Sequence, residues 1–482
     1  MKLSVLRQIL GRILMIEALF MILPLIVGII YREPSNNLLA FGVTIGLLLC
    51  IGLIMSRGQI NQDFIGIKEG FAIVSLSWIL LSFFGGLPFV FSGEIPSLVD
   101  AFFETSSGFT TTGASVLVDV EAMSQSMLFW RSFTHLIGGM GILVFALAVL
   151  PKTGQGSVHI MAAEVPGPTF GKLVPKLHVT ARILYKIYLG MTVVLILLLI
   201  LCGMGPFDAM IHAFGAAGTG GFSNKIASAG HFNSAAVDYV LGIAMIVFGV
   251  NFDLYYLISI GRWREALESE ELRSFLKIIG VACVLIMLLL APKYSSFSRL
   301  LRDVFFTVSS IISTTGYATV DFDLWPLFTH YILLILMFIG SCAGSTAGGL
   351  KVSRVLILFK SGLGEVKRVL SPHRVMVVTK DKRPVKRETI QSAHMYLTLY
   401  IAVFGFSLLL VTLDAPDFMT AFSAVAATLN NIGPGLAAVG PTKSFAFFSD
   451  FSKVVLSFTM IIGRLEILPM LILFSPSTWT KR

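Results

Sequence analysis

Long apolar stretches recur from one end of the chain to the other and are separated by short polar segments. A helix needs about 20 mostly apolar residues to cross the hydrocarbon core of a bilayer. Ten stretches meet this length if frayed ends are allowed: 9–30, 38–55, 70–91, 127–150, 183–204, 236–260, 275–291, 328–359, 393–413 and 451–474. We therefore expect an all-α polytopic membrane protein with both termini on the same side.

Composition narrows the class of protein further. Apolar residues make up 55% of the 482 positions and charged residues only 13%, and the mean hydropathy is +0.85. These values exclude a soluble globular enzyme, a disordered chain and a fibrous protein. The net charge of +9 reflects an excess of Lys and Arg, which in a membrane protein usually lies in the cytoplasmic loops. It therefore does not indicate nucleic-acid binding.

The distribution of Lys and Arg predicts the orientation. Segment 360–387 holds nine Lys or Arg residues, and segment 151–186 holds five. Segment 91–130 contains no Lys or Arg and five acidic residues. Because cytoplasmic loops carry the excess of positive charge, the first two segments should be cytoplasmic and the third external. Both termini then lie in the cytoplasm.

A segment of fixed pattern occurs four times, each time between two predicted spans on the external side. Each copy starts with Asp or Thr, continues with apolar residues, becomes small and polar, and reaches a glycine 13 residues after its start. The copies are DAFFETSSGFTTTGAS from Asp100, DAMIHAFGAAGTGGFS from Asp208, DVFFTVSSIISTTGYA from Asp303 and TAFSAVAATLNNIGPG from Thr420. Tight external turns are the alternative, but turns do not require the same preceding amphipathic unit four times.

Each copy is too short to cross the bilayer, because ten helical residues rise only about 15 Å. The starting Asp or Thr suits a helix N-cap at the external interface. We expect the helix to descend, end just before the glycine, and return in extended form. Irregular backbone at that depth is tolerated only inside protein or beside a wet cavity. Four such loops around one axis would give a ring of carbonyl oxygens that replaces the hydration shell of a monovalent cation.

With this pattern the sequence resembles the Trk/Ktr/HKT superfamily of potassium transporters, over nearly its whole length. The chain length and the extra N-terminal pair of spans, at about 9–55, resemble the TrkH-like branch more closely than the shorter KtrB. The resemblance implies a potassium-selective filter that acts mostly through backbone carbonyls. Its residues would be Thr111, Thr112, Gly113, Thr219, Gly220, Gly221, Thr314, Thr315, Gly316, Asn431, Ile432 and Gly433.

Filter chemistry is expected to favour potassium. Plant relatives that prefer sodium carry serine at the first filter glycine, where this chain has Gly113. The four filter sequences also differ from one another, so strict fourfold symmetry is not expected.

The eighth apolar stretch is too long for one span and contains the small-residue run GSCAGSTAGG at 340–349. Such residues interrupt a helix, although they also permit close helix packing. TrkH-like proteins have an intramembrane gating loop here, so the resemblance implies a gate. Its residues would be Gly340, Ala343, Gly344, Ser345, Thr346, Ala347, Gly348 and Gly349.

Arg464 lies well inside the last apolar stretch, where a charge is costly and usually faces a bundle interior or a water cavity. It matches the pore-lining arginine of the family below the filter, where it would raise the barrier to a cation. The alternative is an ion pair with an acid that only fixes helix packing. Glu466 is not at helical spacing from Arg464 and should point elsewhere.

Other intramembrane polar residues are weaker candidates. Arg131 and His135, and Asn251 with Asp253, are expected to make buried hydrogen bonds. Glu17 could pair with a nearby basic residue that the sequence does not locate.

An enzyme is the alternative from another class. The eight histidines are scattered, and the sequence contains no HExxH, GxSxG, GxGxxG or GxxxxGK[ST] motif. We therefore expect a transporter or channel without a cofactor of its own, with potassium in its pore. A sodium-permeable relative and a proton- or sodium-coupled symporter of the same superfamily remain open.

The expected organisation is an N-terminal pair at 1–58 followed by four pore repeats, at 70–150, 151–260, 261–360 and 361–482. The resemblance implies a homodimer in the bacterial inner membrane, each protomer with its own pore. It also implies a cytosolic nucleotide-binding regulator similar to TrkA. The basic segment 360–387 is an inside loop that could dock an acidic partner or anionic lipid.

Overall fold

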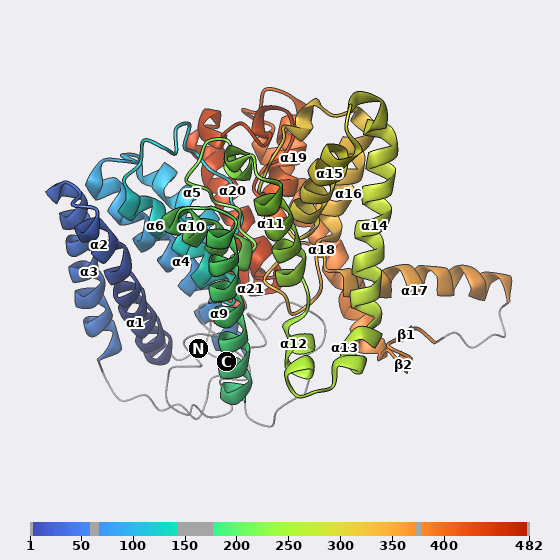
Figure 1. The fold of residues 1–482 in the computed structure, drawn as a ribbon. Coiled ribbons are helices and arrows are strands. Elements are labelled where there is room, and N and C mark those ends of the chain that lie inside the picture. Colours follow the sequence, from blue (N-terminus) through green and yellow to red (C-terminus); the bar gives the residue numbers. More distant parts are fainter. Residues whose placement is uncertain (1–2, 58–66, 142–176, 372–376, 480–482) are drawn as a thin grey trace.

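The computed structural model describes residues 3–57, 67–141, 177–371 and 377–479. The described chain is almost entirely helical (Figure 1), which confirms the predicted fold class. One short antiparallel hairpin was not expected. It consists of β1 (Thr379–Lys380) and β2 (Arg383–Pro384) and lies at the same end of the bundle as both chain termini.

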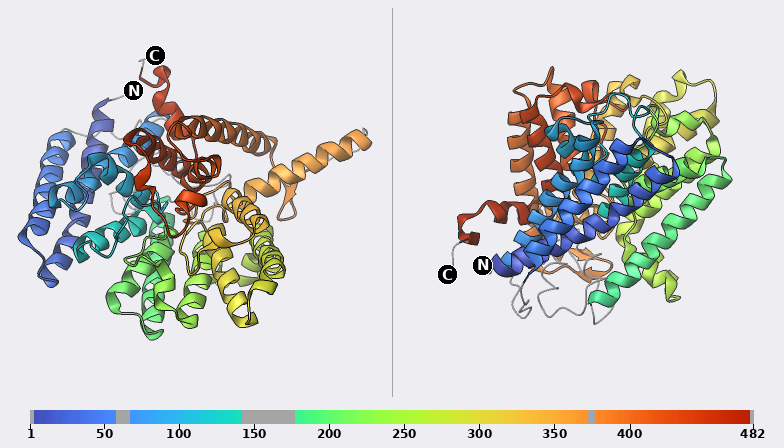
Figure 2. Two further views of the ribbon diagram at one scale, coloured as in Figure 1. Left: turned by 90° about the horizontal axis from the view of Figure 1, so that it is seen from above. Right: turned by 90° about the vertical axis from the view of Figure 1, so that its left-hand side faces the viewer.

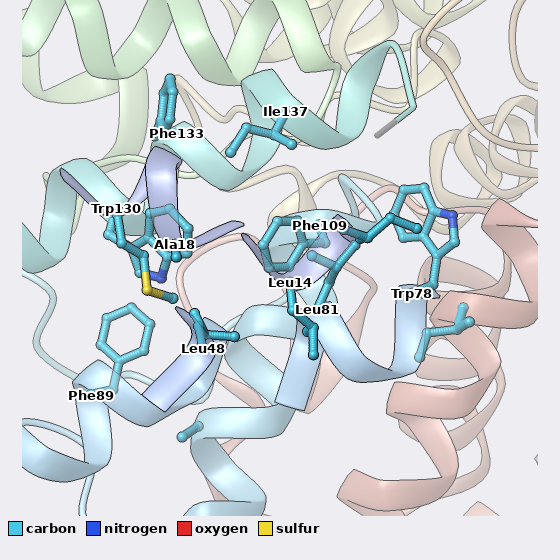
Figure 3. Packing of buried hydrophobic residues seen from close by; sticks show 14 of the residues in the cluster. Leu14, Ala18, Leu48, Trp78, Leu81, Phe89, Phe109, Trp130, Phe133 and Ile137 are labelled. Carbon is cyan, nitrogen blue, oxygen red and sulfur yellow. The ribbon is translucent and has the colours of Figure 1, made fainter. Parts of the chain in front are cut away.

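The N-terminal pair is formed by α1 (Leu3–Phe20) with α2 (Ile22–Ile30), and by α3 (Ser35–Ser56). It packs on the first repeat through a buried cluster of aliphatic and aromatic side chains (Figure 3). Lipid tails are as apolar as leucine, so close packing stabilises this contact more than exclusion from water does. The cluster includes Leu14, Ala18, Leu48, Trp78, Leu81, Phe89, Phe109, Trp130, Phe133 and Ile137.

Four units of helix, short helix and helix follow, and they surround a common centre when viewed from above (Figure 2). The first contains α4 (Ile67–Ser92), α5 (Leu98–Phe109) and α6 (Gln125–Gly139). The second contains α9 (Leu177–Leu201), α10 (Pro206–Gly218) and α11 (Ala235–Phe248) with α12 (Phe252–Ser259). The third contains α14 (Glu270–Leu290), α15 (Phe297–Ile312) and α16 (Leu327–Ile339). The fourth contains α18 (Arg387–Val411), α19 (Phe418–Leu429) and α20 (Asp450–Arg464).

Shorter or peripheral helices complete the described chain. They are α13 (Trp263–Glu268), α17 (Val352–Leu370), α21 (Leu468–Phe474) and α22 (Pro476–Trp479).

Six helices in the described residues are long and apolar enough to cross a membrane, and they coincide with the first, second, third, fifth, seventh and ninth predicted spans. The sixth span is a helix pair, α11 and α12, bent by 92°. Asn251 causes the restart, because its side-chain oxygen accepts a hydrogen bond from Asp253 N at 2.9 Å and caps α12. The last part of the fourth predicted span, residues 142–150, lies outside the described residues.

Like the sixth, the eighth and tenth predicted stretches do not cross as one helix. The interruption of the eighth was expected from its length and its small-residue run, whereas the break in the tenth was not. The eighth, 328–359, ends as a helix at Ile339 and continues as an irregular loop to residue 351, after which α17 leaves the bundle sideways (Figure 1). Positive φ angles at Gly340, Gly344 and Gly349 are incompatible with a continuing helix. The tenth is interrupted at residues 465–467, where Glu466 and Ile467 have positive φ angles.

The starting residues of the four repeats are not the N-caps of the short helices, contrary to expectation. The caps lie upstream, at Ser97, Gly205, Ser296 and Asp417. Ser97 Oγ accepts from Asp100 N at 3.3 Å, and Asp417 Oδ1 accepts from Thr420 N at 2.8 Å. In these two helices a polar cap outside the repeat satisfies a free N–H group, whereas Gly205 and Ser296 make no side-chain cap bond. Asp100, Asp208 and Thr420 lie in the first turn of their helices. Asp303 lies farther inside its helix.

Candidate ion pathway

The four short helices end in the same backbone motif. In each, the N–H group of the residue before the filter glycine bonds to the carbonyl five residues earlier, which is the Schellman arrangement. The pairs are Thr112 N to Ser107 O (2.8 Å), Gly220 N to Gly215 O (2.8 Å), Thr315 N to Ser310 O (2.9 Å) and Ile432 N to Ala427 O (2.9 Å). Four unlike sequences thus adopt one geometry at their descending ends.

A left-handed residue precedes each filter glycine by two positions. These residues are Thr111 (φ 56°), Thr219 (57°), Thr314 (58°) and Asn431 (54°). The glycines also have positive φ: 79° at Gly113, 76° at Gly221, 84° at Gly316 and 100° at Gly433. A left-handed non-glycine residue costs about 1–3 kcal/mol, so the surroundings must hold all four in place. We define the filter loops as residues 111–113, 219–221, 314–316 and 431–433.

The filter loops close into a ring. A Cβ atom built on Gly113 would lie 1.9 Å from Gly220 O, one on Gly221 would lie 2.0 Å from Thr315 O, and one on Gly316 would lie 2.0 Å from Ile432 O. The ring closes where a Cβ on Gly433 would lie 2.8 Å from Thr112 O. Each filter glycine therefore lies against the carbonyl of the residue before the next filter glycine in the chain. The fourth glycine lies against the carbonyl of the residue before the first, which closes the ring. The longer fourth distance shows that the ring is not fourfold symmetric.

An open cavity of about 400 Å³ lies against this ring. All four filter glycines line it, together with segments that follow them in the chain, such as residues 114–120 and 434–445. The cavity therefore lies where the four filter loops meet.

Side chains connect neighbouring filter loops from behind. Asn431 Nδ2 donates to Thr112 Oγ1 and to Met460 O, both at 2.9 Å. The Tyr317 hydroxyl lies 3.0 Å from His212 O and 3.1 Å from Phe222 O and can donate to either one. These buried bonds tie the fourth filter loop to the first, and they tie the residue after the third loop to α10 and to the residue after the second loop, which restricts how far the ring can widen.

The irregular segment 340–351, which we call the intramembrane loop, lies directly beneath the filter. Gly348 N donates to Thr314 Oγ1 at 2.8 Å, and a Cβ on Gly348 would lie 2.1 Å from Asn430 O. The loop is also bonded to the bend after α11, where Cys342 N donates to Gly249 O and Phe252 N donates to Gly344 O. Of the predicted gate residues, Gly348 thus contacts the filter loops, and Gly344 contacts the bend after α11.

Arg464 lies beside the same loop and is only 7% exposed. Its guanidinium donates to Thr346 O at 2.6 Å, to Gly138 O at 2.6 Å and to Gly139 O at 2.7 Å. The side chain therefore bridges the intramembrane loop and the end of α6. Glu466 points away from it, as expected, and forms an ion pair with Arg354.

Two charged residues at this depth were missed by the sequence analysis. Lys351 is 2% exposed and donates from Nζ to Ala347 O within the loop. Glu271 is 4% exposed and accepts from Ala343 N at 2.6 Å. Lys351 lies two residues after the small-residue run and could have been noticed there, whereas Glu271 lies in segment 261–277, in which four acidic and four basic residues balance.

The weaker candidates are partly explained. Arg131 forms a buried ion pair with Glu104 at 2.5 Å and donates to Ser223 O at 3.0 Å, so it makes the expected buried hydrogen bonds. His135 stacks on Phe222, with ring centroids 4.2 Å apart, and within the described residues neither ring nitrogen makes the hydrogen bond that was expected. Within the described residues, neither carboxyl oxygen of Glu17 has a hydrogen-bond partner, so the basic partner considered for it is not found there.

Comparison with known proteins places this geometry in a family. The TrkH family, described as cation transport protein, matches residues 43–481. The "Trk system potassium uptake protein TrkH" of Salmonella typhimurium is 38% identical over 98% of this chain and 99% of its own length, and that of Escherichia coli K12 is 37% identical with the same coverage. The crystal structure of the potassium transporter TrkH from Vibrio parahaemolyticus superimposes with a TM-score of 0.90 at 34% identity and covers 100% of both chains. The chain is a multi-pass membrane protein and belongs to the TrkH family of cation transport proteins.

Proposed function

We propose that this chain takes up potassium across the bacterial inner membrane through one pore per protomer, with the filter loops as its selective element. The closed ring of four glycines carries the proposal. Each position leaves no room for a side chain, so backbone carbonyls alone face the ion. Relatives at 37–38% identity are named potassium uptake proteins, which supports potassium as the ion.

The filter residues have two roles in this proposal. Thr112, Gly220, Thr315 and Ile432 supply the carbonyls that meet the next glycine, and the glycines permit the approach. Thr111, Thr219, Thr314 and Asn431 end the helices in left-handed geometry, which aims the negative ends of four helix dipoles at the pathway.

The intramembrane loop and Arg464 form the gate. The loop contacts the filter from below through Gly348, and Arg464 holds the loop at Thr346. A fixed positive charge in a passage of low dielectric opposes a cation, so both elements contribute to one barrier.

The proposed assembly is based on the names of the relatives, which describe them as parts of a "Trk system". We infer a homodimer and a cytosolic nucleotide-binding regulator similar to TrkA. The basic segment 360–387 on the inner side supplies positive charge for an acidic surface on that partner.

The function is tested with purified protein in liposomes. We expect uptake of a rubidium tracer driven by an internal potassium load, with slow or no uptake of sodium. Uptake that persists without any sodium or proton gradient supports a gated channel, whereas dependence on one of these gradients supports a symporter. Equal sodium and potassium fluxes would contradict the proposed selectivity.

Orientation gives a separate prediction. Ser92 and Ser371 lie near opposite ends of the bundle, and the Lys and Arg distribution places Ser371 inside. Cysteines introduced one at a time at these positions, in a variant with the accessible Cys50 and Cys202 replaced by serine and only the buried Cys283 and Cys342 kept, can be treated with an impermeant thiol reagent on intact cells. We expect labelling at position 92 and none at 371 until the membrane is permeabilised. The reverse pattern would invert the proposed topology.

A further inference from the structure

A continuous set of contacts joins the cytosolic hairpin to the intramembrane loop. Its central residue is Glu271, in the first turn of α14. Glu271 Oε1 accepts from Ala343 N of the intramembrane loop at 2.6 Å. Glu271 Oε2 accepts from Lys380 Nζ of β1 at 3.0 Å. One buried carboxylate thus holds the loop with one oxygen and the hairpin with the other.

The hairpin itself is fastened to the same helix end. Glu270 N donates to Asp381 Oδ1 at 2.7 Å, and Asp381 N donates to Glu270 Oε2 at 3.2 Å. Lys360 of α17 forms an ion pair with Glu270 and donates to Thr379 O at 2.7 Å. The turn residues Asp381 and Lys382 both have positive φ angles, as a tight two-residue hairpin requires. Lys380 is paired with Arg383 in the hairpin, so a displacement of the hairpin would move Lys380.

The position of Glu271 demands both partners. A carboxylate that is 4% exposed needs hydrogen-bond donors and a counter-charge, because burial of an unpaired charge is costly. Ala343 N supplies a donor and Lys380 supplies the charge. If Lys380 is withdrawn, we expect the carboxylate of Glu271 to turn toward solvent. Ala343 N then loses its hydrogen-bond acceptor.

We propose that Glu271 is a positioning residue that couples the cytosolic hairpin to the gate, so that a force on the hairpin loosens the intramembrane loop. This proposal rests on the gating role given to that loop above. It identifies the hairpin as the place where a cytosolic partner can control ion flow without touching the pore. The filter loops make none of these contacts, so ion selectivity should be independent of the coupling.

Single-channel recording of the purified full chain in planar bilayers tests the coupling. The variants Lys380→Gln and Glu271→Gln each remove one member of the pair. Lys382→Gln and Glu268→Gln remove the same charges from neighbouring positions outside the pair. We expect the first two to raise the open probability roughly three- to tenfold, which matches the net contribution of a typical intramolecular hydrogen bond. The two controls should stay at the wild-type value, and the potassium-to-sodium permeability ratio should be unchanged in all four.

The double variant separates coupling from two independent effects. If Glu271 and Lys380 act through one bond, the combined variant should increase the open probability no more than the larger single change does. Full multiplication of the two single effects would overturn the proposal, and so would a Lys380→Gln variant that behaves like Lys382→Gln. If Glu271→Gln fails to fold, the comparison of Lys380→Gln with Lys382→Gln still decides.

The outcomes also distinguish this inference from the proposed function. Wild-type protein that conducts no potassium contradicts the proposed function itself. Protein that conducts potassium, and is activated by removal of Arg464 but not by removal of Lys380, contradicts only the coupling.

Discussion

Replacement of Gly113 by serine is expected to lower the potassium-to-sodium selectivity at least roughly tenfold, the equivalent of about 1.4 kcal/mol in the difference between the two ions. The new Cβ would lie 1.9 Å from Gly220 O, so the first and second filter loops must move apart. A wider ring fits potassium less closely and no longer penalises hydrated or smaller ions to the same degree. The measurement is uptake of both ions in a bacterium that lacks its own potassium uptake.

Gly93→Ser is the matched control for this substitution. Gly93 also has a positive φ angle, 83°, but a Cβ built there meets no atom within 4 Å. It therefore carries the same kind of backbone strain without a clash in the ring. Selectivity should fall in Gly113→Ser and stay unchanged in Gly93→Ser. An unchanged ratio in a well-expressed Gly113→Ser protein would remove Gly113 from the filter.

Periodic features of the sequence predicted most of the membrane spans and the four short helices. The spans follow from the length of apolar stretches, because lipid imposes that length on a helix. The fixed distance of 13 residues placed the four glycines in register, and the structure brings all four into one ring. The register of the four glycines could be predicted because each repeat forms the same local structure, a short helix that must end inside the membrane.

Contacts between distant segments could not be read in this way. The bond from Arg464 to Gly138 O spans 326 residues, and the bond from Asn431 to Thr112 spans 319. Nothing in the local sequence specifies such partners, because they depend on how four unequal repeats close around the centre. The left-handed residues before the glycines were also missed, since threonine rarely adopts that geometry unless its surroundings impose it.

Some of the helix breaks are indicated by local residue types, but these signals were overlooked because the spans were predicted from the length of apolar stretches. Pro469 occupies the first turn of α21, and proline is common where a helix restarts. Asn251 is a typical N-cap residue in the middle of the sixth apolar stretch. Both stretches are long enough to cross as single helices, so the apolar count alone favoured continuity over the local cap and proline signals.

Arg464→Ala is expected to increase potassium flux several-fold. The substitution removes a buried positive charge and also the bonds that hold the intramembrane loop at Thr346 O. A like charge about 5 Å from the ion path costs a passing cation roughly 3 kcal/mol at an effective dielectric near 20. Pore water and the nearby carbonyls reduce that cost, which is why the expected gain is several-fold instead of a hundredfold. Both losses lower the barrier, so the direction of the effect does not depend on which one dominates.

Arg464→Lys separates the charge from the bonding geometry. Lysine keeps the positive charge but lacks the planar fork with which arginine reaches Thr346 O, Gly138 O and Gly139 O together. If charge repulsion dominates the barrier, the lysine variant should conduct like wild type while the alanine variant conducts more. If the bridge to the loop dominates, both variants should show raised open probability in single-channel recordings. A fall in flux for Arg464→Ala, in protein that folds and assembles normally, would mean that the arginine supports the pore and does not close it.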